Sequence, residues 1–233
     1  EKDLSNKYPM HRLLQGEVGS GKTVVALRAM LSVVDSSGQA ALLAPTEVLA
    51  QQHYRTITKI LGELAQAGTL QAGEIGTQVE LLTGSLSAAE KKEIHAKLAS
   101  GQTGIVIGTH ALIEDKVQFK NLGLAIIDEQ HRFGVEQRSK MWKKNEYPPH
   151  VLVMTATPIP RTLAMSVYGD LDISVIDELP PGRKEIATAH RYDKNRLLVF
   201  KFLKEEISRL YNVPCFDPLK DDLSDVVAKI KSI

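Results

Sequence analysis

Gly16-Glu17-Val18-Gly19-Ser20-Gly21-Lys22-Thr23 fits the pattern G-x-x-x-x-G-K-[ST] and decides the fold of this chain. Residues 12–15 (RLLQ) before it read as a short strand, and residues 23–34 after it read as a buried helix. Glycines let the backbone turn its N–H groups inward, and the start of a helix attracts anions. The stretch therefore predicts a loop that holds the phosphates of ATP or GTP, with all eight residues contributing.

Two side chains have specific expected roles in this loop. The amine of Lys22 would reach the β- and γ-phosphates, and the hydroxyl of Thr23 would ligate Mg²⁺. The alternative is a glycine-rich turn before an ordinary helix, which would bind no nucleotide. The strand before the loop and the helix after it favour the nucleotide site.

Length and charge set limits on the class of protein. At 233 residues, the chain has room for one large α/β domain and a small appendage. Its 29 Lys and Arg residues against 28 Asp and Glu residues give a net charge of +1, so net charge alone predicts no polyanion partner. A nucleic-acid surface would have to be a local patch. The single cysteine, Cys215, excludes an intramolecular disulfide framework and is typical of a reducing compartment.

The sequence also predicts where the protein resides. No apolar run approaches the roughly 20 residues that span a bilayer. The first residues, Glu1-Lys2-Asp3-Leu4, lack the pattern of a signal peptide. We therefore expect a soluble cytoplasmic protein with no membrane partner. The chain also starts abruptly, shortly before its first strand, as if it were cut from a longer protein.

Short apolar runs alternate with helix-length segments along the chain. The runs indicate strands at residues 40–44, 79–82, 104–107, 124–127 and 151–154. Helices are indicated at residues 47–64, 87–100 and 134–145. A capping box of Ser87 and Glu90 fixes the start of the second helix. This alternation predicts an α/β fold with a mainly parallel sheet and helices on both faces, whose ligands collect at the carboxyl ends of the strands.

The strand at residues 124–127 ends in the acidic pair Asp128 and Glu129. A carboxylate at the tip of an apolar strand is costly to bury unless a cation or solvent faces it. Next to a phosphate-binding loop, Asp128 would hold Mg²⁺ directly or through water, and Glu129 would polarise the attacking water. Together with Lys22, these two acids are the predicted catalytic residues. The alternative is that Asp128 caps a following helix and Glu129 is a solvated loop charge.

Three stretches together resemble a known family of superfamily 2 helicases. They are residues 12–23 (RLLQGEVGSGKT), 128–138 (DEQHRFGVEQR) and 155–163 (TATPIPRTL). They are similar to the RecG family of bacterial branched-DNA helicases, over roughly residues 10–206. The resemblance implies the first of that family's two RecA-like P-loop NTPase domains, with ATP and Mg²⁺ as cofactors and DNA as partner. The transcription-repair coupling factor is the alternative, and Gln130 followed by His131 favours RecG.

The resemblance also implies which residues meet DNA and which couple the DNA side to the ATP site. Residues near the ends of the predicted strands resemble the motifs with which such motors bind the phosphodiester backbone of DNA. They are Pro45, Thr46, Glu47, Thr83, Gly84, Thr109, His110 and Arg132. A helix starting at Thr46 would aim free N–H groups at a phosphate. The alternatives are a simple helix cap at Thr46, plain turns after the other strands, and a solvated basic face at Arg132.

Thr155-Ala156-Thr157 resembles the motif that links nucleotide state to strand movement in this superfamily. Its hydroxyls could hydrogen-bond the Asp-Glu-Gln-His segment at the end of the neighbouring strand, so that Gln130 and His131 would bridge the ATP site and this motif. The alternative for His131 is an ordinary loop histidine.

Residues 1–190 are expected to form the first helicase domain, and residues 191–233 a linker helix and the start of a truncated or divergent second one. The likeness is expected to fail beyond Ser208. We expect neither a complete second motor domain nor the family's N-terminal wedge domain within these residues, and both would be partners of this chain. We therefore expect an ATP-binding motor half, from replication-fork remodelling, recombination and repair, that binds nucleotide weakly and hydrolyses it poorly alone.

The alternatives to a motor are a signalling GTPase, a small-molecule kinase and a non-hydrolysing scaffold. A signalling GTPase would need a guanine-reading Asn-Lys-x-Asp string, which the sequence lacks, and a small-molecule kinase would need a lid and an acceptor pocket. A non-hydrolysing scaffold would not need intact Lys22, Thr23, Asp128 and Glu129. The motor is therefore the favoured hypothesis.

Overall fold

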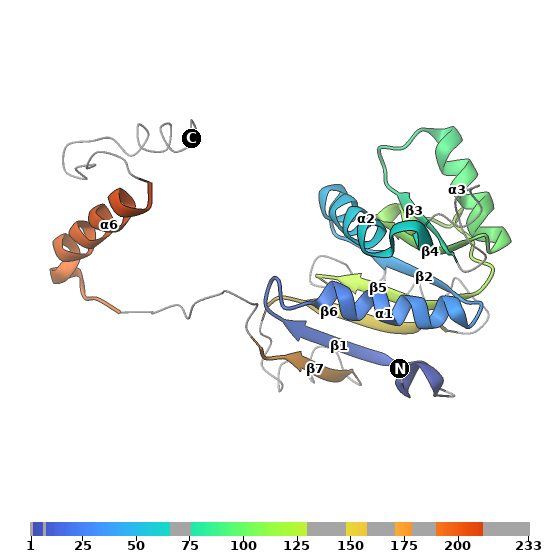
Figure 1. Cartoon of the computed structure of the whole chain (residues 1–233), viewed down its shortest axis with the longest axis horizontal. Helices are drawn as coiled ribbons and strands as arrows, with labels where there is room; N and C mark the ends of the chain where they lie inside the picture. Colours follow the sequence, from blue (N-terminus) through green and yellow to red (C-terminus); the bar gives the residue numbers. More distant parts are fainter. Residues whose placement is uncertain are drawn as a thin grey trace. The chain divides into compact units, whose positions relative to one another are not determined.

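A parallel sheet organises the first part of the chain (Figure 1). The computed structural model describes residues 2–6, 8–65, 76–129, 148–157, 171–178 and 190–211. Within these residues, seven strands pair in the order β3-β4-β2-β5-β6-β1-β7, and every pairing is parallel. The strands are β1 (His11–Gly16), β2 (Gln39–Leu43), β3 (Gln78–Leu82), β4 (Thr103–Gly108), β5 (Leu122–Asp128), β6 (His150–Thr155) and β7 (Asp172–Ile176).

Six of these strands were predicted, with ends that differ by one or two residues. The seventh, β7, covers residues 172–176, which read in the sequence only as an extended segment before the turn at residues 179–183. It is instead an edge strand that pairs with β1 from Arg12 to Gly16. Its apolar residues are few and only partly buried, which is why its sequence gives a weak strand signal.

The helices of this unit are α1 (Lys22–Asp35), α2 (Glu47–Leu61) and α3 (Ala88–Ser100), with 3₁₀ turns η1 (Lys2–Ser5), η2 (Gly62–Ala65) and η3 (His110–Ile113). The capping box of Ser87 and Glu90 is present at the start of α3, as predicted. Helix α2 ends at Leu61 and not at Leu64, because Gly62 takes a φ of 54° and starts the turn η2. No described helix is long and apolar enough to cross a membrane.

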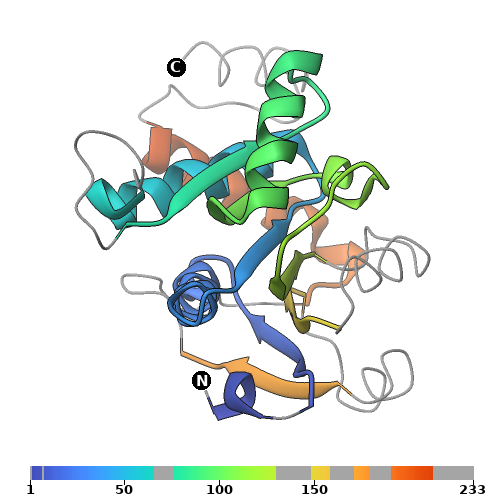
Figure 2. The ribbon, with the colours of Figure 1, turned by 90° about the vertical axis from the view of Figure 1, so that its right-hand side faces the viewer.

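Alternate residues of the strands point to opposite faces of the sheet and form separate cores. On one face, Leu42 and Ile126 belong to a core with buried residues of α1 and α2, among them Met30 and Ile57. On the other face, the buried side chains come from the neighbouring strand positions and from α3 and η3. Figure 2 shows the same layers from the side, with α1 and α3 on opposite sides of the strands. The predicted two-sided cover of the sheet is confirmed.

The chain divides into two compact units, Glu1–Arg183 and Lys184–Ile233. The division falls shortly before the predicted boundary at residue 190. In the second unit, the described elements are η5 (Asp193–Asn195) and α6 (Arg196–Tyr211). Helix α6 agrees with the linker helix expected in residues 191–233, where amphipathic spacing covers residues 195–210. Its assignment to the start of a second motor domain stays a prediction. The helix expected at residues 134–145 lies outside the described residues, and so does a further helical pattern in the sequence from about residue 221.

A buried glutamine joins three segments near the amino ends of the strands. The Gln39 amide donates to the backbone oxygens of Leu98 (3.0 Å) and Thr103 (2.8 Å), and its oxygen accepts from the Asn121 N–H (3.0 Å). The side chain thus connects the start of β2 with the end of α3, the start of β4 and the segment before β5. Nothing in the sequence around Gln39 indicates this role.

We expect the Gln39→Leu variant to lose about 2–4 kcal/mol of unfolding free energy, because buried backbone groups would lose their partners. Urea denaturation followed by circular dichroism measures this loss. The matched control is Gln102→Leu at an exposed position, which should change stability by no more than about 0.5 kcal/mol. Equal stabilities of the two variants would contradict the assigned role of Gln39.

Candidate functional site

The carboxyl ends of β1, β6 and β5 lie side by side at one edge of the sheet. Strand β6 pairs with both neighbours, with Gln15 opposite Thr155 and Asp128 opposite Met154. Because all three strands are parallel, the segments that follow them emerge at the same edge. The glycine-rich loop, the acidic pair and Thr155 are therefore neighbours, although they lie far apart in the sequence.

The loop between β1 and α1 needs its three glycines for different reasons. Gly19 and Gly21 have φ values of 87° and 93°, which other residues rarely adopt. A Cβ atom on Gly16 would lie 2.6 Å from Ser20 Oγ. Gly21 is also the N-cap of α1 and has no side chain to satisfy the first N–H groups of the helix. The start of α1 therefore offers free N–H groups to an anion.

Lys22 lies between this loop and the acidic pair. Its Nζ donates to the backbone oxygens of Gly16 (2.6 Å) and Glu17 (2.9 Å). Burial lowers the pKa of the Lys22 amine from its usual value, and the charges of Asp128 and Glu129 oppose that shift. The amine and both carboxylates thus interact electrostatically at one edge of the sheet, the arrangement expected from the sequence.

Asp128 is the last residue of β5 and is only 9% exposed. Its Oδ2 lies 2.8 Å from Nε2 of His53, a residue of α2. No sequence motif points to His53. Helical spacing places it next to the buried residues Ala50 and Ile57 of the same helix, but nothing in the sequence identifies the acid that it meets.

Glu129 directs its carboxylate toward the segment after β6. Oε1 accepts from the Ala156 N–H (3.0 Å), and Oε2 accepts from the Thr155 hydroxyl (3.3 Å). The Thr155 and Thr157 hydroxyls are 2.7 Å apart. Glu129 has a φ of 51°, in the left-handed region that non-glycine residues seldom occupy. The hydroxyl contact expected between the acidic segment and Thr155-Ala156-Thr157 is thus present.

All the predicted DNA-binding residues except Arg132 follow β2, β3 or β4 and lie at the same edge of the sheet. The Thr46 hydroxyl accepts from the Leu49 N–H (3.3 Å) and so caps α2. This is the helix cap that was the alternative to a DNA contact at Thr46. Glu47 accepts from the Ser85 N–H (3.1 Å) and links the loops after β2 and β3. Both side chains therefore already have local partners.

The remaining candidates for DNA contact differ in how far they are exposed at the surface. Thr83 and Thr109 are each 2% exposed, so their side chains lie below the surface and support the loops. Gly84 and His110 are exposed, and Pro45 is half-buried. The structure therefore offers Pro45, Gly84 and His110 at the surface, and does not support direct contacts from the side chains of the two threonines. Gln130, His131 and Arg132 lie outside the described residues.

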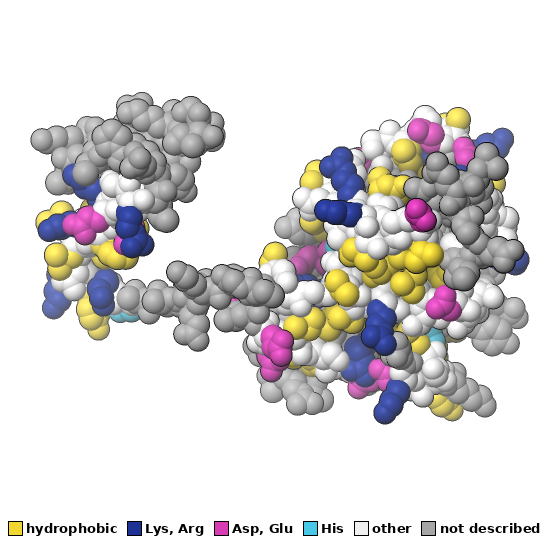
Figure 3. All heavy atoms as spheres, in the orientation of Figure 1, with side chains coloured by type: hydrophobic (Ala, Val, Ile, Leu, Met, Phe, Trp, Pro, Cys, Tyr) yellow, Lys and Arg dark blue, Asp and Glu magenta, His cyan; other side chains and the backbone are white. Residues whose placement is uncertain are grey.

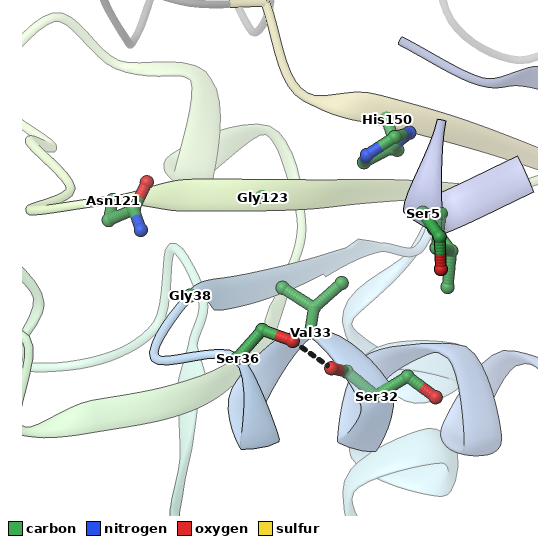
Figure 4. A pocket seen from close by; sticks show the side chains of 9 residues that line it. Ser5, Ser32, Val33, Ser36, Gly38, Asn121, Gly123 and His150 are labelled. Atoms are coloured by element: carbon green, nitrogen blue, oxygen red, sulfur yellow. Dashed lines mark hydrogen bonds between the residues drawn. The ribbon is translucent and has the colours of Figure 1, made fainter. Parts of the chain in front are cut away.

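A cavity of about 400 Å³ lies at the opposite edge of the sheet and is separate from this site (Figure 4). Its lining includes Gly38 before β2, Gly123 near the start of β5 and His150 at the start of β6. These positions mark the amino ends of the strands. The cavity is therefore at the edge away from the glycine-rich loop and the acidic pair.

Exposed valines surround the phosphate loop. Val18 in the loop is 76% exposed, and Val24 and Val25 in the first turn of α1 are 57% and 45% exposed. Figure 3 shows hydrophobic side chains at the surface of this unit among charged ones.

A family model for DEAD/DEAH box helicases matches residues 5–166. The matched range contains the phosphate loop, the acidic pair and Thr155-Ala156-Thr157. This chain belongs to the DEAD/DEAH box helicase family. The described strands β1–β6 and the three motifs all lie within this matched range.

Curated relatives of this helicase chain are named ATP-dependent DNA helicase RecG. The protein from Mycobacterium bovis is 60% identical over 187 residues, which is 79% of this chain and 25% of the relative. The protein from Aquifex aeolicus is 50% identical over 221 residues, 94% of this chain and 26% of the relative. The chain thus spans about a quarter of the length of these relatives. A match over 94% of the chain must extend past Ser208, so the expected end of the likeness there was wrong.

Solved structures agree with this family and with the predicted RecA-like fold. A structure described as RecG bound to three-way DNA junction is 43% identical, with a TM-score of 0.70, and covers 89% of this chain and 26% of that one. The Pyrococcus furiosus Hef helicase domain, at 19% identity and a TM-score of 0.53, supports the fold alone; it covers 87% of this chain and 44% of that one. The resemblance to RecG is confirmed, and the coupling-factor alternative is not favoured.

Proposed function

We propose that this chain is the ATP-binding first motor domain of a bacterial branched-DNA helicase that acts in the cytoplasm in fork remodelling, recombination and repair. The observation that carries the proposal is the convergence of Lys22, Asp128 and Glu129 at one edge of the sheet. Lys22 would bind the β- and γ-phosphates, and the free N–H groups at the start of α1 would bind phosphate oxygens.

The residues at this edge fit Mg²⁺. Such sites commonly combine one or two protein oxygens with water and phosphate oxygens, and so need no protein cage. Among the described residues, no group of three or more His, Cys, Asp and Glu side chains forms such a cage. Asp128 and the half-buried Thr23 hydroxyl are the proposed protein ligands, Asp128 directly or through water. Mg²⁺ bound there would neutralise charge on the phosphates.

Glu129 is the proposed base that orients and polarises the attacking water. Its contacts with Thr155 and Ala156 connect it to the segment proposed to couple ATP hydrolysis to movement on DNA. Gln130 and His131 are proposed members of the same connection. DNA would be bound after β2, β3 and β4, with Thr46, Glu47, Gly84 and His110 among the proposed contacts and supports.

Efficient hydrolysis is proposed to need a second motor domain, and the wedge domain would act on the DNA junction. In related NTPases an arginine supplied from another domain or protein accelerates hydrolysis by 10³–10⁵. The exposed valines beside the phosphate loop are consistent with a surface that another part of a longer protein covers.

We expect a chain extended through the second motor domain to hydrolyse ATP on the order of 10³ times faster than this chain when branched DNA is present. Turnover should be measured with forked, duplex and single-stranded DNA for both proteins. Stimulation by DNA only in the longer protein supports the proposal. Equal turnover of the two proteins, or equal response to all DNA forms, would contradict it.

A further inference from the structure

His53 makes a contact that the proposed ATP chemistry does not account for. Its Nε2 lies 2.8 Å from Oδ2 of Asp128, and both side chains are largely buried, at 13% and 12% exposure. An ionised carboxylate only accepts hydrogen bonds, so in this pair Nε2 carries the proton and donates it. Among the described residues this is the one hydrogen bond made by the Asp128 carboxylate.

The position of His53 on α2 is firmly fixed. Ala50, Ile57 and Leu61 on the same helix are buried in the core against the sheet, and Tyr54 packs against that core. The hydrogen bond therefore joins two rigid elements, the packed helix α2 and the end of the central strand β5. A side chain held this way has little freedom to leave its partner.

The hydrogen bond to Oδ2 of Asp128 also restricts the position of its other carboxylate oxygen, Oδ1. An aspartate carboxylate can rotate about its side-chain torsions, and a hydrogen bond to Oδ2 limits that rotation. Oδ1 has no hydrogen-bond partner among the described residues. The hydrogen bond from His53 to Oδ2 thus limits the directions in which Oδ1 can face at the carboxyl end of β5.

We propose that His53 is a positioning residue that holds the Asp128 carboxylate in the orientation that receives Mg²⁺ with ATP. This inference rests on the proposed function of Asp128. Hydrogen-bond partners that orient metal-binding side chains commonly change metal affinity by 10–100-fold when they are removed. His53 acts through Asp128 and touches neither nucleotide nor water in this role.

The test measures how much Mg²⁺ is needed for ATP binding by this chain, using calorimetry at several Mg²⁺ concentrations. His53→Ala should raise the Mg²⁺ concentration at half-saturation by about 10–100-fold. ATP binding in the presence of a chelator should stay unchanged, because Lys22 and the loop are intact. His53→Gln keeps an N–H donor near the position of Nε2 and should return the value to within about threefold of the original.

Two variants separate hydrogen bonding from packing. His53→Phe fills the space but has no donor, so it should show the same Mg²⁺ defect as His53→Ala. His11→Gln, at an exposed position at the amino end of β1, is the matched control and should leave Mg²⁺ dependence unchanged. Normal Mg²⁺ dependence of His53→Phe would overturn the proposal, because packing alone would then account for the residue.

A spectroscopic readout is independent of nucleotide affinity and turnover. In ¹⁵N NMR spectra, the His53 ring should be protonated at Nε2, and its signal should shift when Mg²⁺ is added with ATP, whereas that of His11 should not. A ring protonated only at Nδ1 would overturn the proposal. If the unaltered chain binds no Mg²⁺-ATP, the proposed function fails. If it binds but the His53 variants behave normally, only this inference fails.

Discussion

Replacing Lys22 with methionine is expected to lower the affinity of this chain for Mg²⁺-ATP by on the order of 100-fold or more. Hydrogen bonds to charged groups contribute about 1.5–3 kcal/mol each, and about 1.4 kcal/mol corresponds to a tenfold change in affinity. The Lys22 amine lies among the carbonyls of the loop and the carboxylates of Asp128 and Glu129. Methionine keeps the length of the side chain and removes the charge and the donors. Isothermal titration calorimetry measures the loss.

Lys91→Met is a matched control for this change. The Lys91 amine also donates to a loop carbonyl at the carboxyl edge, that of Gly84 (2.7 Å), but it belongs to α3. Its removal should change ATP affinity by less than about twofold, because it has no place at the phosphate site. Thermal denaturation of both variants shows whether the fold is retained. ATP binding by a folded Lys22→Met variant at the original affinity would contradict the phosphate-binding role.

The phosphate loop and the acidic strand tip could be predicted because their signals are local. The loop is a contiguous pattern of glycines, a lysine and a hydroxyl, and its φ values at Gly19 and Gly21 are the kind that glycine permits. Asp128 follows directly on an apolar strand. Once the strands are known to be parallel, both features must emerge at one edge. Recognising the two features and placing them at one edge therefore requires no knowledge of contacts between distant residues.

The contacts of Gln39 and His53 could not be predicted, because they depend on which distant group each side chain meets. His53 and Asp128 are 75 residues apart, and Gln39 and Thr103 are 64 apart. Helical periodicity shows only that His53 borders a buried face. A polar residue at such a border can meet solvent, backbone or an acid, and the choice is made by the packing of α2 on the sheet.

Thr83 and Thr109 show a different limit of sequence reasoning. A small hydroxyl residue after a strand can face solvent or turn back under the loop, and the two cases share one sequence pattern. Here the Thr83 hydroxyl lies 3.0 Å from that of Ser85, and the Thr109 N–H donates to the Leu82 oxygen (3.3 Å). Both threonine side chains are buried, whereas their neighbours Gly84 and His110 are at the surface.

Replacing Glu129 with glutamine in a chain that includes the second motor domain should lower ATP turnover by about 10²–10⁴-fold, the usual contribution of a general base. ATP affinity should stay within about threefold, because Lys22 and the loop are unchanged. Rapid-quench single-turnover measurements give the rate of the chemical step, and calorimetry gives the affinity. Glu63→Gln, at an exposed position in η2, is the control and should alter neither.

The contacts of Glu129 make this test specific for the base. A glutamine side-chain oxygen can still accept from the Ala156 N–H, as Oε1 of Glu129 does, so the variant retains this link to the segment after β6. Thr155→Val removes the hydroxyl contact but keeps the carboxylate, and should lower DNA-stimulated turnover much less than Glu129→Gln does. If Glu129→Gln hydrolysed ATP normally while Thr155→Val did not, the carboxylate would serve to hold the neighbouring strand and would not be the base.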